Sequence, residues 1–352
     1  MTRNSRYILL PFSFIYGSVV QLRNKLFDKK ILRSATFDFP IICVGNLAAG
    51  GTGKTPMVEY LVNMLMKKYR VAILSRGYKR KTKGFFIADI NTKTFEIGDE
   101  PMQIHQKFPD VTVAVAEERI IGIPAILNDR PETEIIILDD AFQHREVNAG
   151  LNILLTDYNR LYTNDFLLPA GNLRDTKSSS KRADMIIVTK CPADLDPKER
   201  QKIIQELNPL PQQKVFFTKI IYKNPYHLFS KKEISLEKNL DVLLVCGIAN
   251  PKVIEEFLRA SVSSFQIKKY KDHYHFQQGD IKDINRTFSE IKSSQKIILT
   301  TEKDAVRLLQ FQNEMSDLPI YVLPMEHQFL FNEGVEFDKQ VVEFINSFER
   351  VN

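Results

Sequence analysis

The residues best suited to chemistry lie in a glycine-rich loop directly after the apolar run at residues 41–44. Its glycines let backbone N–H groups approach a polyphosphate, and the start of the following helix presents its positive dipole end to the same ligand. Lys54 can reach the β- and γ-phosphates, and Thr55 can ligate Mg²⁺. Ala48 replaces the first glycine of the usual consensus, but strand, loop and helix follow in the required order. We therefore expect a nucleotide to be bound by Gly50, Gly51, Thr52, Gly53, Lys54 and Thr55.

Two adjacent carboxylates, Asp139 and Asp140, follow the apolar run at residues 135–138. Such an ending is a weak signal by itself, because acidic residues commonly begin loops. Beside a phosphate-binding loop, however, carboxylates at this place hold the metal of P-loop enzymes, so Thr55, Asp139 and Asp140 are the expected metal ligands. Residues 189–192 lack the Asn and Asp that would contact a guanine edge. The predicted cofactors are therefore ATP and Mg²⁺.

Apolar runs that alternate with helical patterns must position these residues. Their apolarity is continuous, which indicates strands buried on both faces of a parallel sheet. These runs are residues 41–45, 71–74, 111–115, 135–138, 152–156 and 185–189. We also expect an inserted hairpin whose strands are residues 85–87 and 94–97. The pattern restarts after a polar linker, which predicts an α/β fold with a P-loop kinase-type parallel sheet domain at 34–225 and a second, smaller α/β domain at 236–352.

The distribution of charge sets the amino-terminal segment apart from the rest of the chain. The 352 residues are 43% hydrophobic and 26% charged, which excludes a disordered, collagen-like or polytopic membrane protein. The net charge of +6 is located in residues 1–33, which hold seven basic residues and one acidic residue. Because the remainder is neutral, we expect no nucleic-acid partner.

The segment at residues 1–33 is predicted to meet a membrane surface. Its uncharged run at residues 7–22 is shorter than the roughly 20 residues that span a bilayer. Apolar residues recur there at spacings of three and four, at Ile8, Phe12, Ile15, Val19, Leu22 and Leu26. With basic residues at both ends, this pattern is typical of an interfacial helix on anionic lipid. The alternative is an N-terminal helix that packs on its own domain.

Several motifs, in order from Ile41 to Leu308, resemble those of the tetraacyldisaccharide 4'-kinase family, the lipid A 4'-kinases. They are NLAAGGTGKTP at 46–56, SRGY at 75–78, GDEP at 98–101, LDDAFQHR at 138–145, LLPAGNLRD at 167–175, DH at 272–273 and TEKDAVRL at 301–308. The resemblance implies transfer of the γ-phosphate of ATP to the 4'-hydroxyl of a lipid A disaccharide 1-phosphate precursor, in lipopolysaccharide biosynthesis. It also implies a peripheral or monotopic location at the cytoplasmic face of the inner membrane. Ala141 and Asp175 depart from the Gly and Glu that are common in this family.

The resemblance also implies catalytic roles for Asp99 and His273, together with Lys54. A sugar hydroxyl is a poor nucleophile, so a base near the γ-phosphate is useful. By resemblance Asp99 is that base, and His273 is its partner from the second domain. From the residues alone, Asp99 is also typical of a helix N-cap and His273 of a loop histidine. We expect the pair to assemble only when the domains meet, which would limit idle ATP hydrolysis.

Contacts to the acceptor are expected from two loops. Tyr78 and Arg80 lie in a basic loop after a predicted strand, at the edge where open α/β sheets bind ligands. The alternative is a solvated charged turn. Arg174 and Asp175 are expected to touch phosphate or metal.

Two other function classes fit part of this pattern. One is a membrane-associated P-loop ATPase switch of the partitioning type, but its signature lysine would stand where this chain has Ala49. The other is a small-molecule kinase without membrane contact. The ATPase switch is distinguished from a lipid kinase by whether ATP turnover needs a sugar acceptor. The small-molecule kinase is distinguished by whether the protein sediments with anionic vesicles.

Overall fold

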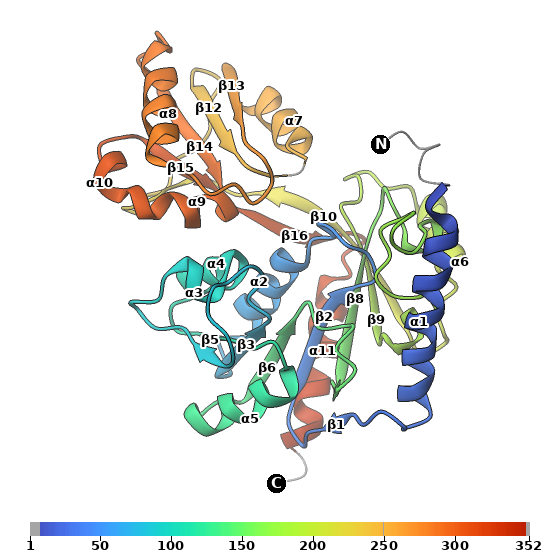
Figure 1. Ribbon diagram of the computed structural model, residues 1–352. Coiled ribbons are helices and arrows are strands. Elements are labelled where there is room, and N and C mark those ends of the chain that lie inside the picture. The colour runs from blue at the N-terminus through green and yellow to red at the C-terminus, as the bar shows by residue number, and fades with distance from the viewer. Residues whose placement is uncertain (1–7, 249, 350–352) are drawn as a thin grey trace. The chain divides into compact units, whose positions relative to one another are not determined.

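The computed structural model describes residues 8–248 and 250–349, and the chain divides into two compact units (Figure 1). Unit 1 comprises the described residues of Met1–Thr92, Ile104–Ile221 and Glu326–Asn352, and unit 2 comprises Lys93–Gln103 and Tyr222–Met325. These boundaries differ from the predicted domains at 34–225 and 236–352, and the described part of the predicted segment at 1–33 joins unit 1. The C-terminal strand and helix return to unit 1, and the short segment Lys93–Gln103 belongs to unit 2.

Unit 1 is built on a nine-stranded sheet with the order β16-β10-β9-β8-β2-β6-β3-β5-β4. Its strands are β2 (Ile41–Asn46), β3 (Val71–Ser75), β4 (Phe86–Ile87), β5 (Thr112–Val115), β6 (Ile135–Asp139), β8 (Leu151–Asp157), β9 (Met185–Thr189), β10 (Lys214–Tyr222) and β16 (Met325–Phe329). A separate parallel pair joins β1 (Ala35–Thr36) to β7 (Val147–Asn148). Strands β5, β3, β6, β2, β8, β9 and β10 pair in parallel. The predicted α/β class with a parallel sheet is therefore confirmed.

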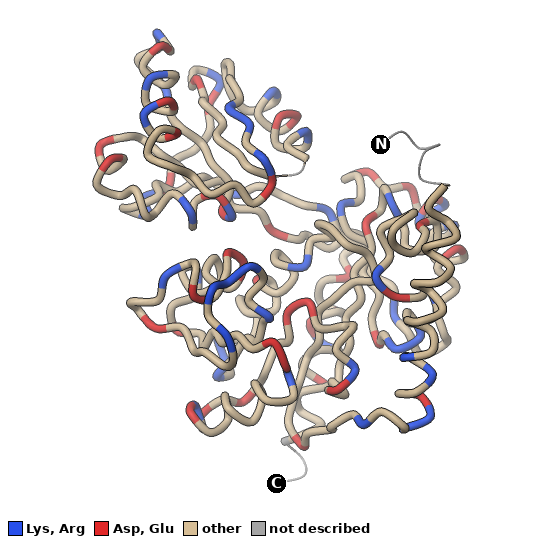
Figure 2. Tube along the Cα trace, in the orientation of Figure 1, with Lys and Arg blue, Asp and Glu red and all other residues tan. Residues whose placement is uncertain are grey.

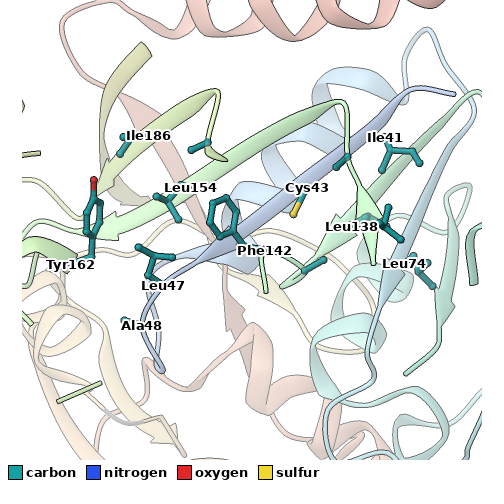
Figure 3. Close-up of a cluster of buried hydrophobic side chains, with 14 of the residues drawn as sticks. Ile41, Cys43, Leu47, Ala48, Leu74, Leu138, Phe142, Leu154, Tyr162 and Ile186 are labelled. Atoms are coloured by element: carbon teal, nitrogen blue, oxygen red, sulfur yellow. The ribbon is translucent and has the colours of Figure 1, made fainter. Parts of the chain in front are cut away.

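Both faces of this sheet are buried, which explains the continuous apolarity of its strands. In β2, Ile41 and Cys43 join one hydrophobic cluster, while Ile42 and Val44 join the cluster on the other face. Figure 3 shows part of the first cluster, with Phe142 packed among the strand side chains. The helices of unit 1 are α1 (Leu10–Asp28), α2 (Lys54–Leu65), α5 (Arg119–Asp129), α6 (Pro197–Leu207) and α11 (Gly334–Glu349). Helix α4 (Asp99–Lys107) runs from unit 2 into unit 1.

The C-terminal helix belongs to unit 1 because of three side chains at a spacing of four. Phe337, Val341 and Ile345 are almost fully buried and lie in the same cluster as Met57 and Leu61 of α2. That spacing gives α11 one apolar stripe, and the stripe completes the covering of the sheet. The sequence pattern predicts the helix but carries no information about which sheet it covers.

The segment after β4 departs from the expected hairpin. Strand β4 forms as predicted and pairs antiparallel with β5. Its expected partner is instead a short helix, α3 (Thr94–Ile97), because the Glu96 side chain accepts the N–H of Lys93 at 2.7 Å. Gly98, with φ at 92°, ends the turn. A local capping interaction therefore replaces the predicted second strand.

Unit 2 has a five-stranded sheet with the order β11-β15-β14-β12-β13. Its strands are β11 (Tyr226–His227), β12 (Asp241–Cys246), β13 (Ser264–Lys269), β14 (Lys296–Thr301) and β15 (Ile320–Leu323). Its helices are α3, α7 (Lys252–Ser261), α8 (Gln278–Glu290), α9 (Glu302–Leu308) and α10 (Gln312–Met315). All strand pairs are parallel except β11 with β15.

Helix α1 packs on unit 1 through small and polar residues and through Phe27 near its C-terminal end. Ser13 Oγ bonds the Leu167 carbonyl at 2.9 Å and accepts the N–H of Ala170 at 2.9 Å. A Cβ on Gly17 would lie 2.7 Å from a Leu167 methyl group, so glycine is required for this close approach. Asn24 Nδ2 donates to Asp175 at 2.8 Å. The packed helix, which the sequence left as an alternative, is therefore what the structure contains.

The apolar stripe of α1 nevertheless stays exposed. Of the predicted stripe, Phe12, Ile15, Val19 and Leu22, together with Ile8 just before the helix, retain at least 60% of their accessible surface, whereas Leu26 is half-buried. Phe14, which is not part of the predicted stripe, is 78% exposed. Figure 2 shows the trace of α1 without charge over most of its length, with Lys and Arg gathered towards its C-terminal end. Arg3 and Arg6, which contribute to the predicted basic segment, lie outside the described residues. Within residues 8–248 and 250–349, no helix has the length and apolarity needed to cross a membrane.

Candidate active site

The glycine-rich loop, here called the P-loop (residues 48–55), connects β2 to α2 as predicted. Gly50 and Gly53 have φ angles of 115° and 84°, in a region that side chains other than glycine rarely adopt. Asn46, the last residue of β2, donates through Nδ2 to Thr52 Oγ1 at 2.8 Å, and both side chains are buried. The loop is therefore tied to the strand that precedes it.

The sheet register brings the predicted acids to the same edge as the P-loop. Val44 of β2 lies opposite Asp139 of β6, so both chains leave the sheet side by side. Ser75 Oγ, at the end of β3, donates to Asp139 Oδ2 at 3.1 Å. Ligands of open α/β sheets bind outside the carboxyl ends of the strands, and this edge is such a place.

Asp140 lies between two cations that the sequence also singled out. Arg174 donates to both carboxylate oxygens of Asp140, at 2.7 and 3.2 Å, and Lys54 Nζ lies 3.6 Å away. Arg174 also donates to Asn46 Oδ1 at 2.6 Å, which joins this ion-pair network to the P-loop anchor. Burial would raise the pKa of Asp140, but Lys54 and Arg174 outweigh it and lower that pKa to about 2. The carboxylate is therefore ionised at neutral pH.

A buried arginine that sequence reasoning missed contacts the same acidic turn. Arg119, the first residue of α5, is 1% exposed and donates to the backbone carbonyl of Asp139 at 3.1 Å. Burial lowers the pKa of Arg119 to about 10 against the opposing effect of Asp139 and Asp140, so it stays protonated at neutral pH. An arginine in the first turn of a helix is usually exposed to solvent, so the sequence gives no signal that the Arg119 side chain is buried.

The other residues expected to contact the acceptor lie in different surroundings. Tyr78 is 58% exposed. The Arg80 guanidinium is almost fully buried and pairs with Glu117 at 2.6 Å. Asp175 is 2% exposed and accepts from Asn24, Thr176, Ser179 and Arg182 at 2.8 to 2.9 Å. These four donors occupy its oxygens, so in this structure Asp175 serves the attachment of α1.

Asp99 and His273 lie together in unit 2. His273 Nδ1 is 3.2 Å from Asp99 Oδ2, and His273 adopts a left-handed φ of 59°. The sequence predicts this pair across two domains, but residues 93–103 place Asp99 in the same compact unit as His273. Burial would raise the pKa of Asp99, but hydrogen bonds from His273 and Arg307 hold it well below its usual range. Asp99 is therefore ionised.

Arg307 is a further member of this cluster that the sequence analysis quoted only as part of a motif. Its Nη2 donates to Asp99 Oδ2 at 2.5 Å and its Nη1 to Asp304 Oδ1 at 3.2 Å. Asp304 is fully buried and accepts the N–H of Gly247 at 2.9 Å and the hydroxyl of Thr301 at 2.7 Å. Arg307 therefore connects Asp99 to the ends of β12 and β14.

Lys303 completes the cluster on the other side of the imidazole. Its Nζ lies 2.9 Å from His273 Nε2 and 3.2 Å from Glu100 Oε1. Since ammonium can only donate, Nε2 accepts from Lys303, while Nδ1 faces Asp99 Oδ2 at 3.2 Å and also lies 3.3 Å from Arg307 Nη2. A signal for Lys303 and Arg307 exists in the sequence, because two cations four residues apart follow an apolar strand in one helix.

Comparisons with known proteins agree with this geometry. The family described as tetraacyldisaccharide-1-P 4'-kinase matches residues 5–346. A tetraacyldisaccharide 4'-kinase of Bacteroides thetaiotaomicron is 44% identical over 351 residues, covering 96% of this chain and 92% of the relative. That of Porphyromonas gingivalis is 46% identical over 338 residues, covering 94% of each chain.

A solved structure gives the same result. It is an LpxK from Aquifex aeolicus, described as a complex with ATP. It superposes with a TM-score of 0.77 at 30% identity, covering 97% of this chain and 99% of the other. The resemblance that the motifs indicated is thus confirmed over almost the whole length: the chain belongs to the tetraacyldisaccharide-1-P 4'-kinase family.

Proposed function

We propose that this chain transfers the γ-phosphate of ATP to the 4'-hydroxyl of a lipid A disaccharide 1-phosphate precursor. The observation that carries the proposal is the P-loop whose Lys54 stands beside Asp140 and Arg174, in a chain of this family. The ATP bound to the Aquifex relative supports ATP as the phosphate donor. A partitioning ATPase is not favoured, because family membership accounts for the motifs outside the P-loop.

The residues of unit 1 bind and neutralise the phosphates. Phosphoryl transfer depends mainly on positioning and on stabilising charge on the phosphate oxygens. The amides of the P-loop hold the phosphate chain, and Lys54 supplies a cation to the transferred group. Arg174 is a second cation at this edge, and its pairing with Asp140 keeps it there before the nucleotide binds.

The oxygens of Thr55, Asp139 and Asp140 fit Mg²⁺, which prefers hard oxygen ligands and commonly takes one or two carboxylates with substrate phosphates. When bound, Mg²⁺ neutralises charge on the phosphate oxygens. The low pKa of Asp140, about 2, keeps this carboxylate ionised across the physiological pH range.

Asp99 is the proposed base, with His273 as its partner. A loose transition state requires little activation of the nucleophile, so an ionised carboxylate that accepts the hydroxyl proton as the new bond forms is sufficient. His273 directs Nδ1 at the same carboxylate oxygen, at 3.2 Å, and can stabilise its charge. Arg307 and Lys303 fix the positions of the two side chains.

We further propose that α1 binds the anionic surface of the inner membrane, at its cytoplasmic face, as a peripheral contact. Hydrogen bonds of Ser13 and Asn24 hold one side of the helix on unit 1, and the opposite side presents the apolar stripe. Exposed apolar patches of this kind mark interaction sites. A lipid acceptor stays in the bilayer, so a membrane-facing helix brings the enzyme to its substrate.

ATP turnover should depend on the lipid acceptor and on the P-loop. Purified protein with ATP and Mg²⁺ should hydrolyse ATP slowly until the disaccharide 1-phosphate is supplied in detergent micelles.

Lys54→Ala and Thr55→Ala should each lower kcat by about 10²-fold or more, since each removes a charge or ligand from the transferred phosphate. The control Lys68→Ala, at an exposed position after α2, should retain activity. ATP turnover that does not depend on the acceptor would support the ATPase switch. A near-normal kcat in the Lys54 and Thr55 variants would show that the nucleotide does not bind at this loop.

Asp99→Ala and His273→Ala should lower kcat with little change in the KM for ATP, and the double variant should be little worse than the worse single variant. Groups that act as one unit are non-additive in this way. Asp283→Ala, which removes a carboxylate of α8 outside the cluster, is the control for charge loss in unit 2. Losses that multiply fully in the double variant would show that the two residues act separately.

Replacing Phe14, Ile15 and Val19 by serine should abolish sedimentation with anionic vesicles and raise the KM for the lipid acceptor. These side chains are 62 to 78% exposed, so the melting temperature and the KM for ATP should change little. The matched control replaces Ile90 and Ile121 of unit 1 by serine, at positions that are 95% and 55% exposed. The control variant should sediment with vesicles as the wild type does.

Continued sedimentation of the triple variant would refute the membrane role of the stripe. Deletion of residues 1–33 is a poorer test, because it also removes the buried partners of Asp175 and Leu167.

A further inference from the structure

Three consecutive carbonyl groups of the P-loop are each held by a side chain from outside the loop. Lys190 Nζ donates to the Gly51 carbonyl. Thr189 Oγ1 lies 2.9 Å from the Thr52 carbonyl, and His327 Nε2 lies 2.9 Å from the Gly53 carbonyl. We name these three side chains, Thr189, Lys190 and His327, the carbonyl brace. The mechanism above uses none of them.

The direction of these carbonyls decides where the loop amides point. In a trans peptide the C=O and the following N–H point in opposite directions, and the cis bond of the described chain is at Leu168–Pro169, outside this loop. The amides that follow the braced carbonyls belong to Thr52, Gly53 and Lys54. The Thr52 amide closes a tight turn onto Gly50 O at 3.0 Å. Trans-peptide geometry directs the amides of Gly53 and Lys54 away from the side chains that hold the carbonyls before them. Amides in such an arrangement are the donors that bind phosphate.

His327 is built to donate at this position. The Gly53 carbonyl can only accept, so Nε2 carries the proton, and Nδ1 then accepts from Thr218 Oγ1 at 2.9 Å. The imidazole is fully enclosed, and burial lowers its pKa to about 4, so it is neutral at physiological pH. A Cβ on Gly53 would lie 3.0 Å from the ring. The histidine and the left-handed φ therefore both require glycine there.

Rigid elements position the brace. Thr189 ends β9, Lys190 follows it in a left-handed conformation with φ at 59°, and His327 lies in β16. Lys190 Nζ also pairs with Asp157, at the end of β8, at 2.7 Å. Thr189 and Asp157 are register partners, so the strand pairing itself sets this geometry. Within residues 189–192, which lack the features of guanine recognition, Thr189 and Lys190 bond the loop backbone instead.

We propose that Thr189, Lys190 and His327 are positioning residues that preset the P-loop amides for the phosphate chain of ATP. The inference rests on the proposed nucleotide site. Because the loop is held before the ligand arrives, less ordering is needed on binding, and affinity for the phosphate chain rises. The brace acts on phosphates and makes no contribution to recognition of the nucleoside.

The test measures Kd for Mg·ATP and for tripolyphosphate by calorimetry on the full chain. Thr189→Val and Lys190→Met should each weaken the binding of both ligands by a similar factor, about three- to tenfold, since each removes one hydrogen bond to a loop carbonyl. Thr189→Ser, which keeps the hydroxyl, should bind like wild type. The matched control is Thr300→Val in unit 2, where the same substitution removes a buried bond from Thr300 Oγ1 to the Val245 carbonyl at 2.9 Å.

Suppose that the Kd values are unchanged in Thr189→Val and Lys190→Met, while the melting temperature falls as much as in Thr300→Val. That result would overturn the proposal, because the brace would then contribute only to packing. Should the buried variant fail to fold, Lys190→Met decides, because its side chain is 35% exposed. Weakening of ATP alone, with tripolyphosphate unaffected, would also overturn it. If the wild-type protein binds neither ligand, the proposed nucleotide site is wrong, and the proposed role of the brace fails with it.

Discussion

A carboxylate that is partly removed from water is stabilised by cations beside it, and Asp140, whose side chain is 34% exposed, has Lys54 and Arg174 as such neighbours. The pairing has consequences well beyond the acidic turn. Arg174 also binds Asn46, which holds Thr52 of the P-loop. The positions of Lys54, the acidic turn and the loop are therefore linked by one network of ion pairs and hydrogen bonds.

The same network extends to the amino-terminal helix. Tyr16 of α1 donates to the backbone carbonyl of Arg174 at 2.9 Å, and the neighbouring Asp175 accepts from Asn24. The segment at residues 174–175 therefore joins the phosphate-binding edge on one side and the attachment of α1 on the other. This arrangement accounts for a helix that turns polar residues inward, because its partners on unit 1 are themselves polar. The proposed membrane-facing stripe and the proposed nucleotide site are thereby built on a common support within unit 1.

Local patterns in the sequence predict the features that depend on local physics. Continuous apolar runs identify the strands around β2, because burial on both faces leaves no alternation, and the cluster of glycines between an apolar run and a helical pattern identifies the loop between β2 and α2. Features that depend on tertiary pairing escape such patterns. The buried state of Asp175 depends on donors as distant as Asn24, and the bond from His327 to Gly53 joins segments 274 residues apart. The helix at Thr94–Ile97 was missed for a different reason, since a cap by Glu96 outweighs its strand-like composition.

The central claim is that the γ-phosphate reaches the 4'-hydroxyl of the lipid acceptor, and following that phosphate tests it most directly. The purified chain would be incubated with γ-labelled ATP, Mg²⁺ and the disaccharide 1-phosphate in micelles, and the lipid product analysed by phosphorus–proton correlation spectroscopy. The account predicts one new phosphate, carrying the label, coupled to the proton at the 4' position. Label found only in inorganic phosphate, or coupled to a proton at another position of the disaccharide, would contradict it.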